Sequence, residues 1–374
     1  MNDADFLREA LDLARKGRGQ ASPNPMVGAV IVRDGQVVGR GYHVYQNVKH
    51  AEIVALEEAG EAARGATLYI NLEPCSHQGR TGPCADALIA AGIARVVASM
   101  KDPNPLVAGD GFAKLRNAGI AVEIDEQSAP AARKLNEAFV HFMRTRRPLV
   151  TLKTALTLDG KISAPDDNSG WITSEIARAH VQMLRHDCDA ILTGIGTALA
   201  DDPLLTDRSG LPRSRPLLRV VLDSRLRLPS DSKLVMSCNN DLAVITTSAA
   251  SQEKREALEK AGVKVMVFDG PLGRVDIRRT IDWLGSQALL SVIVEAGSHL
   301  NWAVLDAECA DKIFFYYAPK ILGGMQSLPM AGGIGRRRRA DAIVLRNLEL
   351  HSISKDEFAV EAYVVKELDV YGGC

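Results

Sequence analysis

Apolar residues recur at helical spacing near the start of the chain and predict a first helix. They are Phe6, Leu7, Ala10, Leu11, Leu13 and Ala14. Two short β-rich runs, 26–32 and 36–41, flank Asp34-Gly35, a dipeptide typical of a tight hairpin turn. Beyond them the pattern alternates, and a hairpin followed by alternating helices and strands indicates a layered α/β/α domain with a mixed sheet. The predicted helices are 51–63, 84–91, 112–117 and 131–144, and the predicted strands are 66–72, 95–99 and 121–124.

A change of direction is predicted after this first domain. Pro148 follows Arg144-Thr145-Arg146-Arg147 and disfavours helix at the residue before it. We therefore expect two domains, 1–147 and 148–374. The second is also α/β, with a helix over 174–185 and further β runs over 149–155, 190–193, 218–222, 243–246, 264–268, 291–295 and 312–317. The last two β runs, 345–352 and 358–365, leave no room for a crossover helix and should pair antiparallel.

The composition is that of an ordinary globular protein. The chain has 374 residues, with 45 Lys+Arg against 46 Asp+Glu and a formal net charge of −1. This balance argues against a nucleic-acid binder that works through a large basic field. The first 20 residues show no signal-peptide pattern, and no uncharged run has the length of a membrane helix. We expect a cytoplasmic protein whose six cysteines stay reduced.

Three metal-ligand residues stand where the predicted structure changes. His50 opens a helix in His50-Ala51-Glu52, Cys75 follows Pro74 at the end of a strand, and Cys84 begins the next helix. Two helix N-termini favour thiolate, the form of cysteine that binds metal. One imidazole and two thiolates leave the fourth tetrahedral position for water, which is typical of catalytic zinc. We predict one Zn²⁺ per chain at His50, Cys75 and Cys84, with the pKa of its water lowered toward about 7.

Glu52 is the predicted catalytic residue. Positions i and i+2 of a regular helix point about 200° apart. Glu52 and His50 can therefore face one cavity only if His50 lies at the non-helical entry of the helix. The carboxylate would then accept a proton from the water and deliver it to the leaving nitrogen.

The spacing of these motifs resembles that of one family. Zinc nucleobase deaminases show H-x-E…P-C-x-x-C, whereas here eight residues, 76–83, separate the two cysteines. This longer stretch, with Asn24-Pro25-Met26-Val27-Gly28 and the His50–Glu52 box, is similar to the bacterial bifunctional riboflavin-biosynthesis family. In that family a diaminohydroxyphosphoribosylaminopyrimidine deaminase is fused to a 5-amino-6-(5-phosphoribosylamino)uracil reductase. Gly82 stands where the family usually has proline.

The resemblance implies an N-terminal cytidine-deaminase-like domain. It also implies substrate contacts in that domain, at Asn24, His43, His77 and Arg80. His77 and Arg80 lie between the two cysteines and suit a substrate that bears a phosphate. For His43 and His77 the alternative is a surface histidine without a role.

The second domain lacks a G-x-G-x-x-G after a strand, which argues against a Rossmann site. Stretches 150–162, 171–173, 198–206 and 294–297 resemble the family's reductase, whose fold is like dihydrofolate reductase and whose cofactor is NADPH. Thr157 and Ala296 depart from the family's usual serine and glycine. The implied NADPH contacts are Ala155, Trp171, Thr197, Asp201, Ser224, Gly297, Ser298, His299, Leu300, Asn301, Trp302 and Ala303. The implied substrate contacts are Ser169, Arg185, Leu205, Arg208 and Glu295.

The chemistry of several of these residues fits such roles. Amides at the helix start after Gly297 suit a pyrophosphate, and Ser224-Arg225 is a candidate for the 2′-phosphate. Arg185 and Arg208 suit phosphate because guanidinium pairs with it bidentately. Lys153 and Asp201 are candidates for proton transfer, with a solvated strand-end lysine as the alternative for Lys153. The run 332–339 is predicted to be a solvated loop, with a phosphate-binding or regulatory role as the alternative.

The resemblance covers about residues 5–366 and implies a bifunctional enzyme. The expected first step is zinc-dependent hydrolytic deamination of 2,5-diamino-6-(5-phosphoribosylamino)pyrimidin-4(3H)-one. The second is NADPH-dependent reduction of the ribosyl side chain to ribityl. We expect this small phosphoribosyl pyrimidine as the partner, no nucleic acid or membrane partner, and a homo-oligomer.

Two other functions fit the sequence less well. A deaminase acting on nucleic acid is opposed by the near-neutral charge and by only 5% aromatic residues, because single-strand binding uses a basic groove and stacking rings. A non-enzymatic zinc scaffold is opposed because structural zinc normally has four protein ligands.

Overall fold

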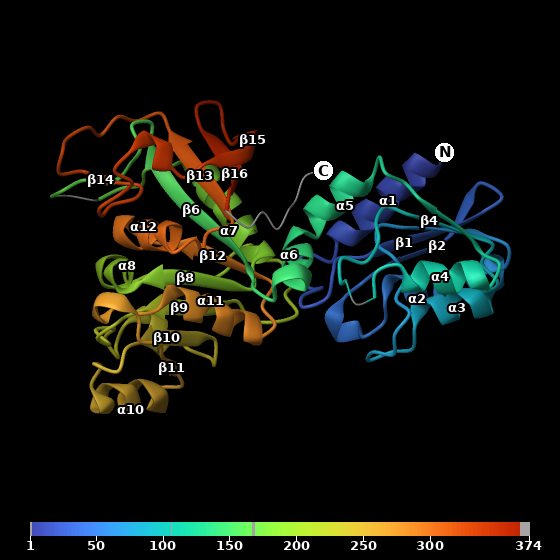
Figure 1. Cartoon of the computed structure of the whole chain (residues 1–374), viewed down its shortest axis with the longest axis horizontal. Coiled ribbons are helices and arrows are strands. Elements are labelled where there is room, and N and C mark those ends of the chain that lie inside the picture. The colour runs from blue at the N-terminus through green and yellow to red at the C-terminus, as the bar shows by residue number, and fades with distance from the viewer. Residues whose placement is uncertain (1, 106, 167–168, 367–374) are drawn as a thin grey trace. The chain divides into compact units, whose positions relative to one another are not determined.

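The computed structural model describes residues 2–105, 107–166 and 169–366, and these form two compact units (Figure 1). The division falls between Arg146 and Arg147, and unit 1 also takes in a short later segment, Pro212–Arg215. Ser214 attaches this segment, because its backbone N–H and its hydroxyl donate to the carbonyls of Gly19 (2.9 Å) and Gln20 (2.5 Å). The sequence pattern does not predict this excursion.

Unit 1 is built on a five-stranded sheet in the order β2-β1-β3-β4-β5. The strands are β1 (Gly28–Arg33), β2 (Gln36–Tyr42), β3 (Thr67–Ile70), β4 (Arg95–Ala98) and β5 (Ala121–Ile124). β1 runs antiparallel to β2 and β3, while β3, β4 and β5 are parallel, so the predicted mixed sheet is confirmed. The hairpin turn is also confirmed, since Asp34 (φ 50°) and Gly35 (φ 76°) both adopt the left-handed conformation that such a turn requires.

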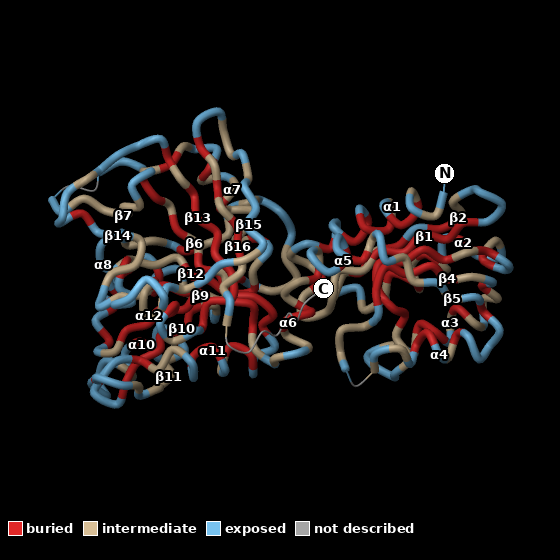
Figure 2. The backbone as a smooth tube through the Cα atoms, turned by 45° about the horizontal axis from the view of Figure 1, so that its top comes forward, coloured by how far each residue is buried: buried red, intermediate tan, exposed pale blue. Residues whose placement is uncertain are grey.

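Helices cover both faces of this sheet. They are α1 (Asp3–Arg15), α2 (Ala51–Ala59), α3 (Cys84–Ala91), α4 (Asp110–Asn117), α5 (Ala129–Leu135) and α6 (Glu137–Thr145). Successive strand residues point to opposite faces: Ala29 and Ile31 pack with α2, α3 and α4, whereas Val30 and Val32 pack with α1. The predicted α/β/α layering is therefore confirmed, and Figure 2 shows the strands buried between the helices.

Two predicted helices of unit 1 need correction. The segment 51–63 is helix α2 followed by a short 3₁₀ helix (Gly60–Ala63), because Gly60 has a φ of 53°. The segment 131–144 is not one helix, since α5 and α6 are separated at Asn136. The buried Asn136 side chain holds the backbone of Met26 instead, accepting from its N–H (2.8 Å) and donating to its carbonyl (2.9 Å). This long-range bond interrupts a continuous helical pattern.

Helix α2 packs directly on the backbone of β2. A Cβ at Gly39 would lie 2.2 Å from the Ala55 carbonyl oxygen, and one at Gly41 would lie 2.1 Å from the Ala51 carbonyl oxygen. Only glycine permits this approach. Ala51 is the first residue of α2, so Gly41 packs against the start of that helix.

Unit 2 is built on a nine-stranded sheet in the order β11-β10-β9-β8-β12-β6-β13-β16-β15. The strands are β6 (Leu149–Thr157), β8 (Ala190–Gly194), β9 (Leu218–Leu222), β10 (Leu242–Thr246), β11 (Lys264–Val267), β12 (Ser291–Glu295), β13 (Lys312–Ala318), β15 (Leu345–Ser352) and β16 (Phe358–Val364). The seven from β11 to β13 are parallel. β15 and β16 pair antiparallel, as predicted. A separate small pair joins β7 (Lys161–Ser163) to β14 (Leu328–Pro329).

Helices again lie on both faces of this sheet. They are α7 (Glu175–Asp187), α8 (Ile195–Asp201), α9 (Lys233–Met236), α10 (Gln252–Lys260), α11 (Ile277–Ser286) and α12 (Ser298–Asp306). α11 and α12 pack in one core cluster with Val292 and Val294, and α8, α9 and α10 pack in another with Ile293. The sequence pattern predicts α7 and the start of α12, but α8, α9, α10 and α11 are additions from the structure. None of the described helices combines the length and apolar character needed to cross a membrane.

We expect Gly41→Ala to destabilise unit 1 by about 1–3 kcal/mol or more, the usual cost of overpacking, because the new methyl group would push α2 off β2. Scanning calorimetry measures the unfolding midpoint. Gly79→Ala is the control, since open space surrounds that position. Equal midpoints for the two variants would show that α2 can shift without cost.

Candidate active sites

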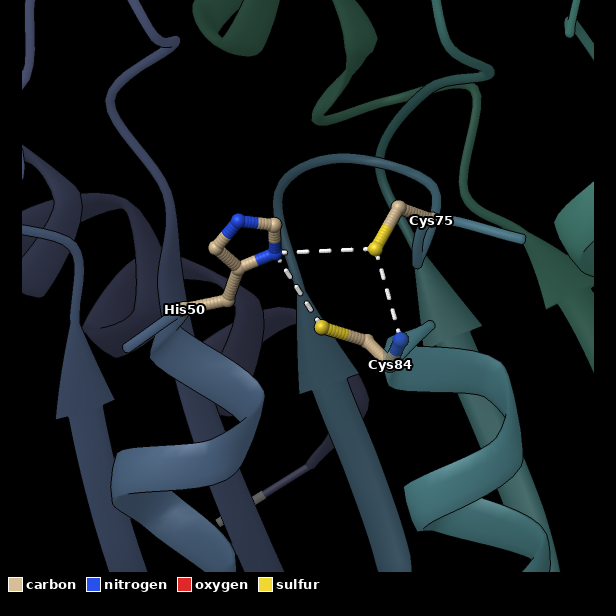
Figure 3. Close-up of side chains that lie close together, drawn as sticks. All are labelled: His50, Cys75 and Cys84. Atoms are coloured by element: carbon tan, nitrogen blue, oxygen red, sulfur yellow. Dashed lines mark hydrogen bonds between the residues drawn. The ribbon is translucent and has the colours of Figure 1, made fainter. Parts of the chain in front are cut away.

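Three predicted metal ligands of unit 1 meet at one point (Figure 3). His50 is the N-cap of α2, Cys75 lies in the loop after β3, and Cys84 is the first residue of α3. His50 Nδ1 lies 3.2 Å from Cys84 Sγ and 3.5 Å from Cys75 Sγ. All three ligand atoms lie within 4.8 Å of one another. One nitrogen and two sulfurs at such separations fit the donor set of a zinc site.

The geometry at His50 explains how Glu52 can face the same point. His50 has an extended backbone (φ −77°, ψ 161°), and α2 begins only at Ala51. The expectation that His50 lies at a non-helical entry is confirmed. The Glu52 side chain is 3% exposed and is hydrogen-bonded with Cys84. Burial raises the pKa of Glu52 to about 7, and the neighbouring Cys75 adds to this rise.

The two sulfurs differ in their affinity for a proton. Hydrogen bonds from the Cys84 thiol, from His50 and from the Cys84 backbone N–H (3.3 Å) lower the pKa of Cys75 to about 4, although burial opposes this. The same thiol contact raises the pKa of Cys84. The hydrogen bond with Cys75 also raises the pKa of His50. The site therefore stabilises a thiolate, the form of cysteine that binds metal.

Of the expected substrate contacts in unit 1, Asn24 and His43 lie beside this centre. Asn24 Nδ2 is 3.0 Å from His43 Nε2, and the rings of His43 and His50 have centroids 5.3 Å apart. His43 is 3% exposed, so the surface-histidine alternative is wrong for it. His77 and Arg80 lie instead on the exposed part of the 76–83 loop. Arg80 stacks over the Tyr45 ring at 4.6 Å and donates to the Tyr45 carbonyl.

Sequence reasoning missed a buried carboxylate next to the metal centre. Glu73 accepts three backbone N–H groups, from Asp102 (3.0 Å), Gly109 (2.9 Å) and Phe112 (3.1 Å). It thereby caps α4, whose own N-cap residue, Gly109, has no side chain. A Cβ at Gly111 would lie 2.0 Å from the Pro74 carbonyl oxygen, so this segment packs closely on the Cys75 loop. The available signal was an acidic residue between apolar Leu72 and Pro74-Cys75.

A cavity of about 430 Å³ opens beside this segment. Ser99, Lys101, Asp102, Arg133 and Arg144 are among the residues that line it. Asp102 also borders the Cys75–His77 loop. Burial raises the pKa of Asp102, and the charge of His77 opposes this rise. The cavity therefore adjoins the metal centre through one carboxyl group.

In unit 2 a buried anion lies between two cations. Glu295, at the end of β12, contacts Lys153 of β6 (3.2 Å) and Arg185 of α7 (2.6 Å). The three side chains are 11–13% exposed. Burial acts to raise the pKa of Glu295, but the two neighbouring positive charges outweigh it and hold the pKa at about 2. The solvated-lysine alternative for Lys153 is therefore wrong.

The expected substrate contacts of unit 2 are brought together only in part. Arg185 and Glu295 form the ion pair just described, and Arg185 also donates to the Thr206 carbonyl (3.0 Å), beside Leu205. Leu205 is buried in the loop that follows α8. Arg208, in the same loop, and Ser169 are exposed.

The expected NADPH contacts lie mostly at the carboxyl ends of the parallel strands, where ligands bind in open α/β sheets. Thr197 and Asp201 are in α8 after β8, Ser224 follows β9, and Gly297 caps α12 after β12. The buried Ser298 hydroxyl has no hydrogen-bond partner, which fits an anion at this helix start. Ala155 lies on β6, and Trp171 is 71% exposed.

One residue in the expected NADPH-contact stretch 297–303 lies in the protein interior. Asn301 is fully buried and donates to Thr154 Oγ1 (3.2 Å) and to the Met330 carbonyl (2.9 Å). It therefore ties α12 to β6. The other residues of this stretch are His299, which is exposed, and Leu300, Trp302 and Ala303, which are half-buried.

The glycine- and arginine-rich run 332–339 forms a loop, as predicted. Arg336 pairs with Asp306 (2.9 Å), and Arg338 pairs with Asp341 (2.7 Å). Gly332 lies against the start of α12, with its N–H 3.0 Å from the Ser298 carbonyl.

Comparisons with known proteins match both units of the chain. Residues 148–358 match the family model described as RibD C-terminal domain, and residues 1–100 match that of the cytidine and deoxycytidylate deaminase zinc-binding region. The riboflavin biosynthesis protein RibD of Escherichia coli K12 is 42% identical over 371 residues, covering 95% of this chain and 98% of the relative. That of Actinobacillus pleuropneumoniae is 40% identical over 356 residues, covering 95% and 94%.

The chain belongs to the RibD family.

Solved RibD structures share the whole fold. Acinetobacter baumannii RibD superposes with a TM-score of 0.86 at 36% identity, over 97% of this chain and 99% of that one. A Thermotoga maritima protein, described as a diaminohydroxyphosphoribosylaminopyrimidine deaminase and 5-amino-6-(5-phosphoribosylamino)uracil reductase, gives 0.81 at 34% identity over the same shares. The predicted fold classes are confirmed: a cytidine-deaminase-like N-terminal part and a RibD reductase C-terminal part. The predicted activities, a deaminase and a reductase of riboflavin biosynthesis, are confirmed as those of the RibD family.

We expect Cys84→Ser to reduce the zinc content of the purified chain at least tenfold at limiting zinc, because a serine hydroxyl is a poor substitute for thiolate. Elemental analysis after dialysis measures the bound zinc. Cys238→Ser is the control, because Cys238 belongs to unit 2 and is not one of the three grouped ligand residues. Full occupancy in Cys84→Ser would mean that another side chain supplies the third ligand.

A second prediction concerns Glu295, whose low pKa makes unit 2 sensitive to acid. A depressed pKa stabilises the folded state fully above the unfolded value, 4.5, and this contribution is lost as the pH falls toward about 2. This difference between the folded and unfolded pKa of Glu295 contributes on the order of 3 kcal/mol to the free energy of unfolding. Glu295→Gln should therefore be less stable than the parent at pH 7, and the gap should narrow below about pH 4.5.

Urea unfolding followed by tryptophan fluorescence measures the free energy of unfolding of unit 2. All three tryptophans lie in that unit: Trp171, Trp283 and Trp302. Glu308→Gln is the control, since Glu308 is half-exposed in its contact with Arg278. If the free energies of unfolding of Glu295→Gln and the parent differ by the same amount from pH 7 to pH 3, the low pKa of Glu295 is contradicted.

Proposed function

We propose that this chain performs both steps named for its Thermotoga maritima relative. Residues 1–147 deaminate 2,5-diamino-6-(5-phosphoribosylamino)pyrimidin-4(3H)-one by hydrolysis, and residues 148–374 reduce the ribosyl side chain of the product to ribityl with NADPH. The observation that carries the first assignment is the convergence of His50, Cys75 and Cys84 beside the buried Glu52. We further propose a cytoplasmic homo-oligomer without a membrane partner. The net charge of −1 supports the additional proposal that it has no nucleic-acid partner.

The deaminase assignment follows from what the side chains can do. Zinc held by His50, Cys75 and Cys84 supplies a Lewis acid that makes water a nucleophile near neutral pH. The Glu52 carboxyl group interacts with both His50 and Cys75, and burial raises its pKa to about 7. It accepts a proton as water oxygen bonds to the amino-bearing carbon, and it returns a proton to the nitrogen that leaves as ammonia.

The rim of the metal centre supplies the substrate contacts. The Asn24 amide and the His43 ring, linked at 3.0 Å, lie next to His50 and can bond to the base or the ribose. Arg80 and His77 stand on the exposed loop between the two cysteines, where a phosphate can reach them. Their side chains would hold the phosphate of the substrate by charge.

The reductase assignment rests on the strand ends of unit 2. NADPH supplies a hydride for C1 of the ribosyl group. The start of α12, with the unpartnered Ser298 hydroxyl, suits its pyrophosphate, and Ser224-Arg225 is our candidate for the 2′-phosphate. When C1 is reduced and its bond to the ring oxygen breaks, that oxygen takes a proton. Lys153, whose Nζ lies 3.2 Å from Glu295, can donate it.

A coupled assay with the phosphoribosyl pyrimidine and NADPH, following ammonia release and NADPH loss together, tests the proposal. We expect Glu52→Gln to retain zinc but to lose ammonia release by about 10²–10⁴-fold, the usual contribution of a general acid–base. NADPH oxidation with supplied deaminated substrate should be unchanged, because Glu52 belongs to unit 1.

Glu57→Gln is the matched control, since Glu57 lies in the same helix with its side chain 53% exposed. Undiminished ammonia release in Glu52→Gln would remove that residue from the chemistry. A wild-type chain that consumes no NADPH would remove the reductase half of the proposal.

A further inference from the structure

The loop 202–209 of unit 2 adopts a conformation that its own residues do not favour. Asp202 (φ 39°) and Leu205 (φ 52°) both lie in the left-handed region, where a non-glycine residue is strained. Leu205 is also buried. Such a loop persists only when its surroundings hold it.

Three side chains of α7 form hydrogen bonds that keep this loop in place. Arg185 donates to the Thr206 carbonyl (3.0 Å), and Gln182 accepts from the Arg208 backbone N–H (2.9 Å). His186 Nδ1 lies 2.9 Å from Asp207 Oδ2. From β9, the fully buried Arg219 donates to the Leu204 carbonyl (3.1 Å). Residues 204, 206, 207 and 208 are thus each hydrogen-bonded to a side chain of α7 or β9.

The His186–Asp207 contact is the most enclosed of these. The two side chains are 1% and 7% exposed. The other carboxylate oxygen of Asp207 accepts from the Ser209 backbone N–H (2.9 Å), which closes a tight turn around Arg208. The imidazole therefore holds the side chain that shapes this turn, and the exposed Arg208 stands at its centre.

The guanidinium of Arg185 is largely committed elsewhere. Its Nε and Nη2 both donate to Glu295, at 2.6 and 3.1 Å, and its Nη1 donates to Thr206. The two N–H groups that could bind a phosphate bidentately already donate to a carboxylate. Arg208 is then the exposed cation that this loop presents to an anionic ligand.

We propose that His186 and Asp207 form a positioning pair that sets Arg208 to bind the 5′-phosphate of the reductase substrate. This rests on the reductase activity proposed above. The pair does not touch the reacting atoms, so losing it weakens the binding of the phosphate and leaves the chemical step unchanged. Asparagine at position 186 can place an amide N–H where the imidazole Nδ1 stands and should preserve the contact.

The test measures KM and kcat for NADPH oxidation with 5-amino-6-(5-phosphoribosylamino)uracil, and the Kd of ribose 5-phosphate as a non-reacting probe. We expect His186→Leu and Asp207→Ala each to raise KM and the probe's Kd about tenfold or more, with kcat within about twofold of the parent. His186→Asn should stay near the parent. The two losses should not add in the double variant, because each single variant already removes the His186–Asp207 contact.

Two controls separate positioning from general damage. Ammonia release by unit 1 should be unchanged in every variant. Lys366→Met, which removes a different ion pair of unit 2 with Asp311, should leave KM unchanged. Ribose without its phosphate should bind all variants equally weakly, which a merely structural role would not predict.

The inference is overturned if KM and Kd stay at the parent values in both His186→Leu and Asp207→Ala, or if kcat falls while the Kd for ribose 5-phosphate holds. Should His186→Leu not fold, Asp207→Ala carries the same readouts from the loop side. The probe also separates the two proposals, because loss of ribose 5-phosphate binding in the variants supports the pair even where the wild-type chain oxidises no NADPH.

Discussion

The metal centre of unit 1 depends on two helices beginning at the same place. α2 starts one residue after His50 and α3 starts at Cys84, so the positive ends of both helices meet around two sulfurs and one imidazole. Glycine at position 41 lets α2 lie on the sheet, and Glu73 fastens α4 and its preceding loop behind Cys75. The residues of the chemistry are few, but backbone approaches and one buried carboxylate hold them in place.

The two units use buried carboxylates in opposite ways. The groups that interact with Glu52 are His50, Cys75 and Cys84, and burial raises its pKa to about 7, where it can exchange protons. Glu295 lies between Lys153 and Arg185, and its pKa falls to about 2 although it is also buried. The first can gain or lose a proton near neutral pH, as the proposed deamination requires. The second remains an anion that pairs with a lysine and with an arginine, and that arginine also donates to the loop that follows α8. Neighbouring charge, and not burial alone, separates a proton carrier from a fixed anion.

Local sequence patterns predicted many of the helices and strands. The predicted elements 84–91, 121–124, 218–222, 291–295 and 345–352 match the observed bounds. For 218–222 and 291–295 the reason is that buried parallel strands leave continuous apolar runs. The break at Asn136 was not predictable, since its cause is a bond to Met26, 110 residues away. The same applies to the segment Pro212–Arg215, which leaves its sequence neighbours to join unit 1.

The sequence by itself determined the donor set, the order of the motifs and the choice of Glu52 over other carboxylates, because residue type and spacing limit what can bind a metal. Only the tertiary structure decided which charges meet. It placed His43 beside His50, turned the guanidinium of Arg185 onto Glu295, and enclosed His186 with Asp207. Such contacts join residues that are far apart in the chain, and their energies depend on burial and distance, which exist only once the chain has folded.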